Sequence, residues 1–157
     1  MTYNIYTDTP EVITFPSVIF ATFLIVGLVT DRALIHTLEF YGYPHPGGWS
    51  FIILGILLFC WSSAHFIKAK TFIDIRKPAT KLITQGPYKI SRKPMYLSNT
   101  LIYLGISIVF GQTVTLVCIL PCLFVLHYYA IVKEEQYLEL KFGNIYLSYR
   151  QRVRRWV

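Results

Sequence analysis

Turn formers and bases come together in one polar segment, residues 79–97, which reads ATKLITQGPYKISRKPMYL. The glycine–proline pair at 86–87 breaks the chain, and Pro94 suits the first turn of a helix, where a missing N–H costs little. Free backbone N–H groups at such a helix start, beside Arg92 and Lys93, favour an anionic group such as a carboxylate. The segment therefore predicts an anion-binding helix start, and the alternative is an ordinary basic loop before a proline.

Two adjacent acids, Glu134 and Glu135, follow the last long apolar segment. At about 100° per residue, Glu134 falls within roughly 80° of an apolar stripe, whereas Glu135 points more to the side. A carboxylate on an apolar face at a membrane boundary is costly unless it is paired or binds something. Two interpretations stay open, a salt bridge from Glu134 to Arg92 or Lys93 and the binding of a ligand.

His127 lies about two turns before Glu134 on the same face if the helix is continuous. An intramembrane histidine is a functional candidate, and the alternative is a hydrogen bond to a neighbouring helix. The cysteines match no zinc or CxxC spacing, and each lies in an apolar run. We therefore expect neither a metal site nor a disulfide from Cys60, Cys118 and Cys122.

The composition places these residues in a membrane protein. The 157 residues are 54% hydrophobic and 17% aromatic, with a formal net charge of +7 and a mean hydropathy of +0.48. A soluble nucleic-acid binder would not carry this much apolar sequence, so the positive charge indicates anionic headgroups and ligands rather than nucleic acid. By length the chain is one domain, residues 1–157.

Four apolar segments predict an all-α integral membrane protein with four transmembrane helices, at residues 12–30, 49–67, 95–110 and 113–132. Residues 1–67 hold the first two spans, and residues 68–157 hold the polar segment, a helical hairpin and the C-terminal part. The beginning of the chain lacks the pattern of a cleaved signal peptide, so we expect the first span to remain.

The distribution of bases predicts the orientation. Of the fifteen Lys and Arg residues, fourteen lie in residues 68–94 or after residue 132, and the remaining one is Arg32. The positive-inside rule then puts both termini and the polar segment on the cytoplasmic side of an inner membrane. Residues 133–153 are too polar to span, but an apolar period predicts a C-terminal amphipathic helix against that face, with the stripe Leu138, Phe142, Ile145, Tyr149 and Val153.

Together these residues resemble the isoprenylcysteine carboxyl methyltransferase and phospholipid methyltransferase superfamily. The resemblance runs from about residue 71 to 156, and each of its parts is weak alone but specific in order and spacing. The parts are LITQGPY at 82–88, SRKPMYL at 91–97, Glu134-Glu135, and Phe142-Gly143 with Tyr146 and Tyr149.

The resemblance implies a membrane methyltransferase that uses S-adenosyl-L-methionine. It also implies which residues contact this methyl donor, namely Thr80, Lys81, Leu82, Ile83, Tyr88, Lys93, Pro94, Met95, Tyr96, Glu134 and Glu135, and the basic helix start adds Arg92 as a partner for the donor carboxylate. If the acceptor is an amine, Glu135 or His127 is a candidate to take up its proton.

Two departures bear on the substrate. Prenylcysteine methyltransferases have histidine where this chain has Lys93, and an arginine four residues before the first glutamate, where this chain has Ala130. We therefore expect a small amphiphilic acceptor, such as a lipid amine, isoprenoid, thiol or carboxylate, that enters from the lipid bilayer. The alternatives are an NADPH-dependent membrane reductase related to sterol reductases, and a noncatalytic membrane scaffold.

Overall fold

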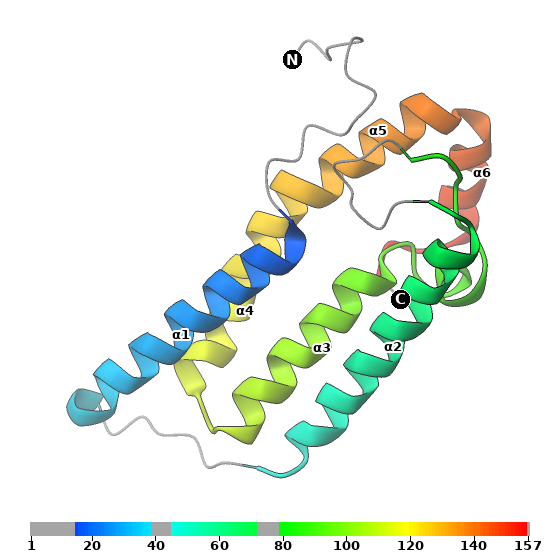
Figure 1. The fold of residues 1–157 in the computed structure, drawn as a ribbon. Helices are drawn as coiled ribbons and strands as arrows, with labels where there is room; N and C mark the ends of the chain where they lie inside the picture. The colour runs from blue at the N-terminus through cyan, green and yellow to red at the C-terminus, as the bar shows by residue number, and fades with distance from the viewer. Residues whose placement is uncertain (1–14, 39–44, 72–78, 157) are drawn as a thin grey trace.

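The computed structural model describes residues 15–38, 45–71 and 79–156, and all regular secondary structure in these ranges is helical, with no strand in them (Figure 1). The order of elements is α1 (Pro16–Leu38), α2 (Gly48–Lys68), the 3-10 turn η1 (Gly86–Lys89), α3 (Pro94–Val109), α4 (Thr113–Leu126), the π-helical turn η2 (His127–Ile131), α5 (Val132–Phe142) and α6 (Asn144–Arg152). The expected all-helical class is confirmed for the described residues.

Three helical segments of the described chain are long and apolar enough to cross a membrane, Pro16–Ala33, Gly48–Lys68 and Thr113–Phe142. They match three of the four predicted spans, although the first residues of the predicted span 12–30 lie outside the described residues. The helix α3 is apolar but has 16 residues. At about 1.5 Å per residue it is roughly 24 Å long, which is less than the hydrocarbon thickness of about 30 Å.

The helices α2 and α3 pack closely in antiparallel directions because small residues face each other. A Cβ added at Gly48 would lie 2.6 Å from the carbonyl oxygen of Gly105, and one added at Gly55 would lie 2.8 Å from that of Ser98. Gly48, Gly55 and Ser62 are buried at seven-residue intervals on α2. The backbones can approach this closely because no larger side chain separates them.

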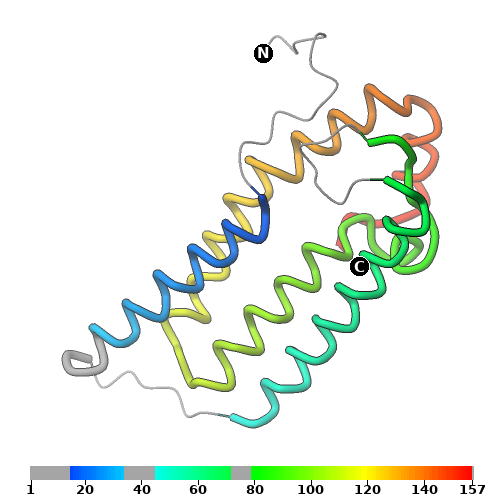
Figure 2. The backbone as a smooth tube through the Cα atoms, viewed as in Figure 1, coloured from blue at the N-terminus to red at the C-terminus, as the bar shows by residue number. Residues whose placement is uncertain are grey.

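The helix α1 packs mainly against α4, so residues far apart in the sequence lie side by side (Figure 2). A Cβ at Gly27 would lie 2.8 Å from the Cα of Thr115. One turn further along α1, the buried Asp31 carboxylate accepts hydrogen bonds from the backbone N–H groups of Val114 and Thr115, at 2.9 and 2.8 Å, and from the Thr115 hydroxyl at 2.6 Å. Asp31 therefore caps the start of α4 from another helix.

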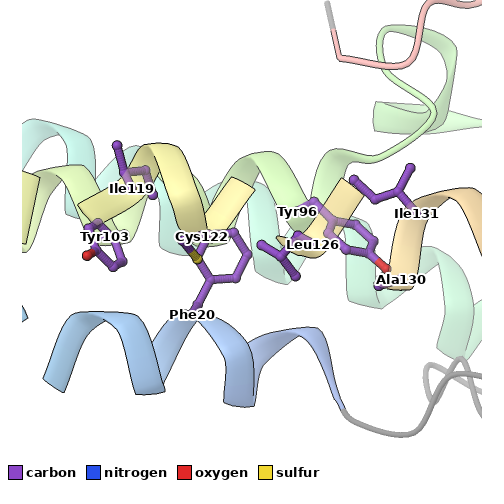
Figure 3. Packing of buried hydrophobic residues seen from close by; sticks show 8 residues of the cluster. All are labelled: Phe20, Tyr96, Tyr103, Ile119, Cys122, Leu126, Ala130 and Ile131. Carbon is purple, nitrogen blue, oxygen red and sulfur yellow. The ribbon is translucent and has the colours of Figure 1, made fainter. Parts of the chain in front are cut away.

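A cluster of buried side chains joins α1, α3, α4 and η2 (Figure 3). Its members are Phe20, Tyr96, Tyr103, Ile119, Cys122, Leu126, Ala130 and Ile131. The Tyr103 hydroxyl donates to the carbonyl of Thr115 at 2.9 Å, so the polar group of this ring has a partner inside the cluster.

The expected single amphipathic helix over residues 133–153 is wrong. The helix that begins at Thr113 continues through η2 and α5 to Phe142. It ends because Gly143 adopts φ +50°, a conformation that glycine reaches far more readily than other residues. A separate helix, α6, follows, and the predicted stripe is broken because Ile145 is 68% exposed.

Candidate functional site

The turn before α3 is held by the C-terminal tail. The backbone N–H of Arg92 donates to the carbonyl of Arg154 at 3.0 Å, and the Ser91 hydroxyl donates to the carbonyl of Arg155 at 3.0 Å. The helix then begins at Pro94, as its sequence predicted, and buries it. The tail thus fixes the residues from which the site's cations project.

Lys93 and Tyr96 both contact the carboxylate of Glu134. The Lys93 Nζ lies 2.7 Å from Glu134 Oε2, and the Tyr96 hydroxyl donates to the same oxygen at 3.0 Å. The Lys93 side chain is 3% exposed, whereas that of Glu134 is 18% exposed. Beyond this ion pair, the Lys93 ammonium has no hydrogen-bond partner among the described residues. A buried cation with unused protons and a carboxylate open on one side can receive a polar ligand.

Arg92 and Arg155 both contact the carboxylate of Glu135. Arg155 binds it with two nitrogens, Nη2 at 2.6 Å and Nε at 3.1 Å, and the Arg92 Nη1 lies 3.2 Å from Oε1. Arg92 Nη1 also donates to the Tyr146 hydroxyl at 3.1 Å. Glu135 is buried, which differs from the sideways position that helical spacing gave it, because the tail folds back over that side of α5.

The loop before η1 holds the remaining predicted donor contacts from residues 80–88. Thr80 and Lys81 are exposed, and Leu82 and Ile83 are half-buried. Tyr88 is buried, with its ring edge against Phe66 of α2 at 5.6 Å between centroids.

Two hydrogen bonds from C-terminal tyrosines hold this loop. The Tyr149 hydroxyl donates to the carbonyl of Tyr88 at 2.7 Å, and the backbone N–H of Ala79 donates to the Tyr137 hydroxyl at 3.0 Å. The loop is therefore tied to both α5 and α6, which come about 60 residues later in the chain.

Burial keeps the tyrosines on the polar side of the site neutral. Desolvation is the largest cause that raises the pKa of Tyr146, to about 12, with Glu135 adding to it and Arg92 opposing it. Desolvation also raises the pKa of Tyr88, with the charge of Glu134 adding to the effect, and that of Tyr149. These hydroxyls therefore stay protonated near neutral pH and can donate hydrogen bonds.

Within the described part of the chain, the His127 side chain makes no hydrogen bond or ion pair with the residues around Glu134 or Glu135. His127 opens η2, is half-buried, and packs its ring against Tyr128 at 5.0 Å between centroids. The π-helical turn changes the angular register between His127 and Glu134, so the sequence argument for a shared face does not apply directly.

The structure brings together Arg92, Lys93, Tyr96, Glu134 and Glu135, five of the predicted site residues. Sequence reasoning missed Ser91 and Arg155, which hold this group in place. Arg155 is one of several basic residues at the C-terminus, and nothing in that pattern marks it out. Among the described residues no group of three or more His, Cys, Asp or Glu side chains could hold a metal ion.

Comparisons with known proteins identify a family. A family model described as "Phospholipid methyltransferase" matches residues 45–145. This range includes η1, α3, α4 and four charged residues of the site, Arg92, Lys93, Glu134 and Glu135. No solved structure matches the chain.

Two curated relatives cover the chain in part. A Haemophilus influenzae protein with the name "Uncharacterized protein" is 40% identical over 63 residues, which are 40% of this chain and the whole of that protein. The nickel-cobalt-cadmium resistance protein NccN of Alcaligenes xylosoxydans xylosoxydans is 36% identical over 67 residues, 43% of this chain and 30% of that protein.

Proposed function

The chain belongs to the phospholipid methyltransferase family, and from this membership we propose that it is an S-adenosyl-L-methionine-dependent methyltransferase acting on a small amphiphile within reach of the membrane. The observation that carries the proposal is the contact of Lys93 and Tyr96 with the half-open carboxylate of Glu134. These residues come from the two segments that the family resemblance implicates in donor binding.

The residues present fit the polar groups of this donor. The Lys93 ammonium has protons for a carboxylate, and the start of α3 adds backbone N–H groups beside it. Glu134 accepts hydrogen bonds from an amino group or from ribose hydroxyls through the side that solvent reaches. Tyr88 and the half-buried Leu82 and Ile83 offer apolar surface for the rest of the molecule.

The donor, when bound, supplies an electrophilic methyl group on a positively charged sulfur. The chain's own residues then have to position the acceptor nucleophile in line with that methyl and exclude water. For an amine acceptor, one proton must leave the nitrogen, and we propose Glu135 or His127 as its acceptor. Glu135 must first release one of its arginine contacts, whereas the His127 imidazole has no hydrogen bond within the described residues.

We further propose that the acceptor enters from the bilayer and is not a prenylcysteine. Ala130, which stands where prenylcysteine methyltransferases have arginine, is fully buried in the apolar cluster with Tyr96 and Leu126. No cation therefore lies at this position to neutralise a substrate carboxylate. An acceptor with an amine, thiol or hydroxyl at headgroup depth fits this environment.

The orientation follows from the bases and completes the proposal. We propose four membrane spans, with the short α3 crossing beside α2, and with both termini and the site on the cytoplasmic side of the inner membrane. Cysteines introduced at Asp8 and Gln151, in a variant with its own cysteines changed to serine, should react with an impermeant reagent from the same side. Reaction from opposite sides would overturn this topology.

Calorimetric titration of the purified protein tests the function most directly. We expect S-adenosylhomocysteine to bind and NADPH not to bind. Binding of NADPH alone would favour a membrane reductase, and binding of neither would favour a scaffold. Membranes given donor with a labelled methyl group should then incorporate label into lipid or small-thiol fractions, and efficient labelling of a prenylcysteine mimic alone would contradict the acceptor proposal.

A further inference from the structure

A pocket of about 460 Å³ lies between the loop that carries η1 and the end of α6. Residues of the loop form one wall and residues at the end of α6 form the other. The lining residues are Thr84, Gln85, Lys89, Tyr149, Arg152 and Val153. The residues proposed to bind the methyl donor contribute no side chain to this lining.

The lining chemistry selects an anion. It contains two cations, three side chains with a neutral polar group and no acid. Neither Lys89 nor Arg152 has an ion-pair partner within the described residues, in contrast to Arg150, whose Nη1 lies 3.1 Å from Glu139 Oε2. The Arg152 Nε donates to the carbonyl of Ser148 at 3.1 Å, which orients the side chain and leaves its terminal nitrogens for a ligand. A guanidinium fork with a nearby ammonium and hydroxyl suits phosphate oxygens.

The position of the pocket indicates where such a phosphate comes from. Phe66, in the last turn of the membrane-spanning α2, packs against Tyr88 of η1, so the loop rests at the end of that span. Ile67, which follows Phe66 in the chain, is 70% exposed, and Ile90, which follows Lys89 of the pocket, is 60% exposed. Exposed apolar residues next to a basic pocket are expected at the level of the lipid headgroups.

From these observations we propose that this pocket binds the phosphate of an anionic phospholipid, at a place separate from the methyl-transfer site. The lipid's acyl chains would lie along the exposed apolar residues Ile67 and Ile90. The charge-bearing residues of the site are Lys89 and Arg152, and Thr84 and Gln85 donate the neutral hydrogen bonds.

The pocket is connected to the methyl-transfer site through one side chain. Tyr149 lines the pocket, and its hydroxyl donates to the carbonyl of Tyr88 at 2.7 Å. A bound headgroup would hold the loop and α6 together and so fix Tyr88, which raises donor affinity. This second effect rests on the proposed function, whereas the binding of lipid does not.

Lipid binding is measured on the whole protein in detergent, by native mass spectrometry with phosphatidylglycerol and phosphatidylcholine as competing probes. The test variant is Lys89→Gln with Arg152→Gln, and the matched control is Lys68→Gln with Arg150→Gln, which removes the same charge outside the pocket. At about 1 kcal/mol for each base near a membrane surface, the test variant should bind phosphatidylglycerol roughly tenfold or more weakly than the control.

Three outcomes would overturn the proposal. Equal losses in the two variants would show a diffuse surface effect, and unchanged binding in both would place the lipid elsewhere. Displacement of phosphatidylglycerol by millimolar inorganic phosphate would assign the pocket to free phosphate instead. Thermal melting curves confirm that the variants fold, and Lys89→Arg with Arg152→Lys should restore binding. Lipid binding without donor binding would reject the proposed function and leave the lipid site intact.

Discussion

Carboxylates lie near both ends of the helix that runs from Thr113 to Phe142, but their partners differ. At its start, Asp31 receives hydrogen bonds from two backbone N–H groups and one hydroxyl, and all three donors belong to Val114 and Thr115. Near its other end, Glu134 and Glu135 face cations from the turn before α3 and from the C-terminal tail.

This difference separates a structural carboxylate from one that can bind a ligand. The donors around Asp31 are neutral and fixed by the close approach of α1 to α4 at Gly27. Beside Glu134, the buried Lys93 ammonium has protons that no hydrogen bond uses, and part of the Glu134 carboxylate meets solvent. Charges on long side chains can rearrange around a ligand, whereas a helix cap cannot do so without loss of the helix start.

The largest effect should come from Asp31→Ala. This change leaves two backbone N–H groups and a hydroxyl without their acceptor, and each such loss costs about 1 to 3 kcal/mol, so we expect a loss of about 4 kcal/mol in the free energy of unfolding. Denaturation in detergent measures it. Asp31→Asn keeps one acceptor oxygen and should lose less. If the folded Asp31→Asn protein bound the donor more weakly, the distinction between a structural Asp31 and a ligand-binding Glu134 would be wrong.

Glu135→Gln should destabilise the protein by about 3 kcal/mol, because Arg92 and Arg155 lose the charge that compensates them in a buried site. The same denaturation experiment measures it, with Arg155→Lys as a milder variant that keeps one ionic contact. If Glu135→Gln instead left stability unchanged and abolished only turnover with an amine acceptor, Glu135 would be the proton acceptor rather than a support of the loop.

Glu134→Gln should weaken S-adenosylhomocysteine binding by roughly tenfold or more, as expected for the loss of a charge-assisted hydrogen bond of about 1.5 to 3 kcal/mol. Its effect on affinity should exceed that of Glu135→Gln in the fraction that folds. Calorimetric titration of both variants decides this. Small and equal losses in affinity would argue against Glu134 as a donor ligand.

Tyr146→Phe should have the smallest effect, about 1 kcal/mol at neutral pH, through loss of the hydrogen bond from Arg92. The pKa of Tyr146 is raised to about 12, above the ordinary value of a free tyrosine. Its contribution is therefore present below pH 10 and is lost as pH rises toward 12. Across this pH range, the melting temperature should fall less steeply for Tyr146→Phe than for the unchanged protein.

The parts of the fold that depend on nearby residues were predictable. The span expected at residues 49–67 is α2 (Gly48–Lys68), and the helix start expected at Pro94 is the first residue of α3. Apolar length and the fixed φ of proline act locally, so the sequence displays them directly. The salt bridge between Glu134 and Lys93 was one of the two open interpretations, and the structure contains it.

The parts that depend on distant residues were not predictable from one sequence. The bond from Arg155 to Glu135 requires the tail to fold back after Gly143, and spacing alone does not identify which of the C-terminal arginines returns. The continuous helix through η2 was missed because charged residues after Val132 suggested an end to the span. Asp31 was missed as a cap because its partners lie more than 80 residues later in the chain.

The pairing of α1 with α4 has a consequence for how the protein is made. The helices α2 and α3 are neighbours in the sequence and can associate as soon as both leave the ribosome. Asp31, however, waits for partners that lie 84 residues further along the chain, a delay of about 4 to 17 s at bacterial and eukaryotic rates of synthesis. During that time its carboxylate lacks the hydrogen-bond donors that Val114 and Thr115 supply in the folded protein.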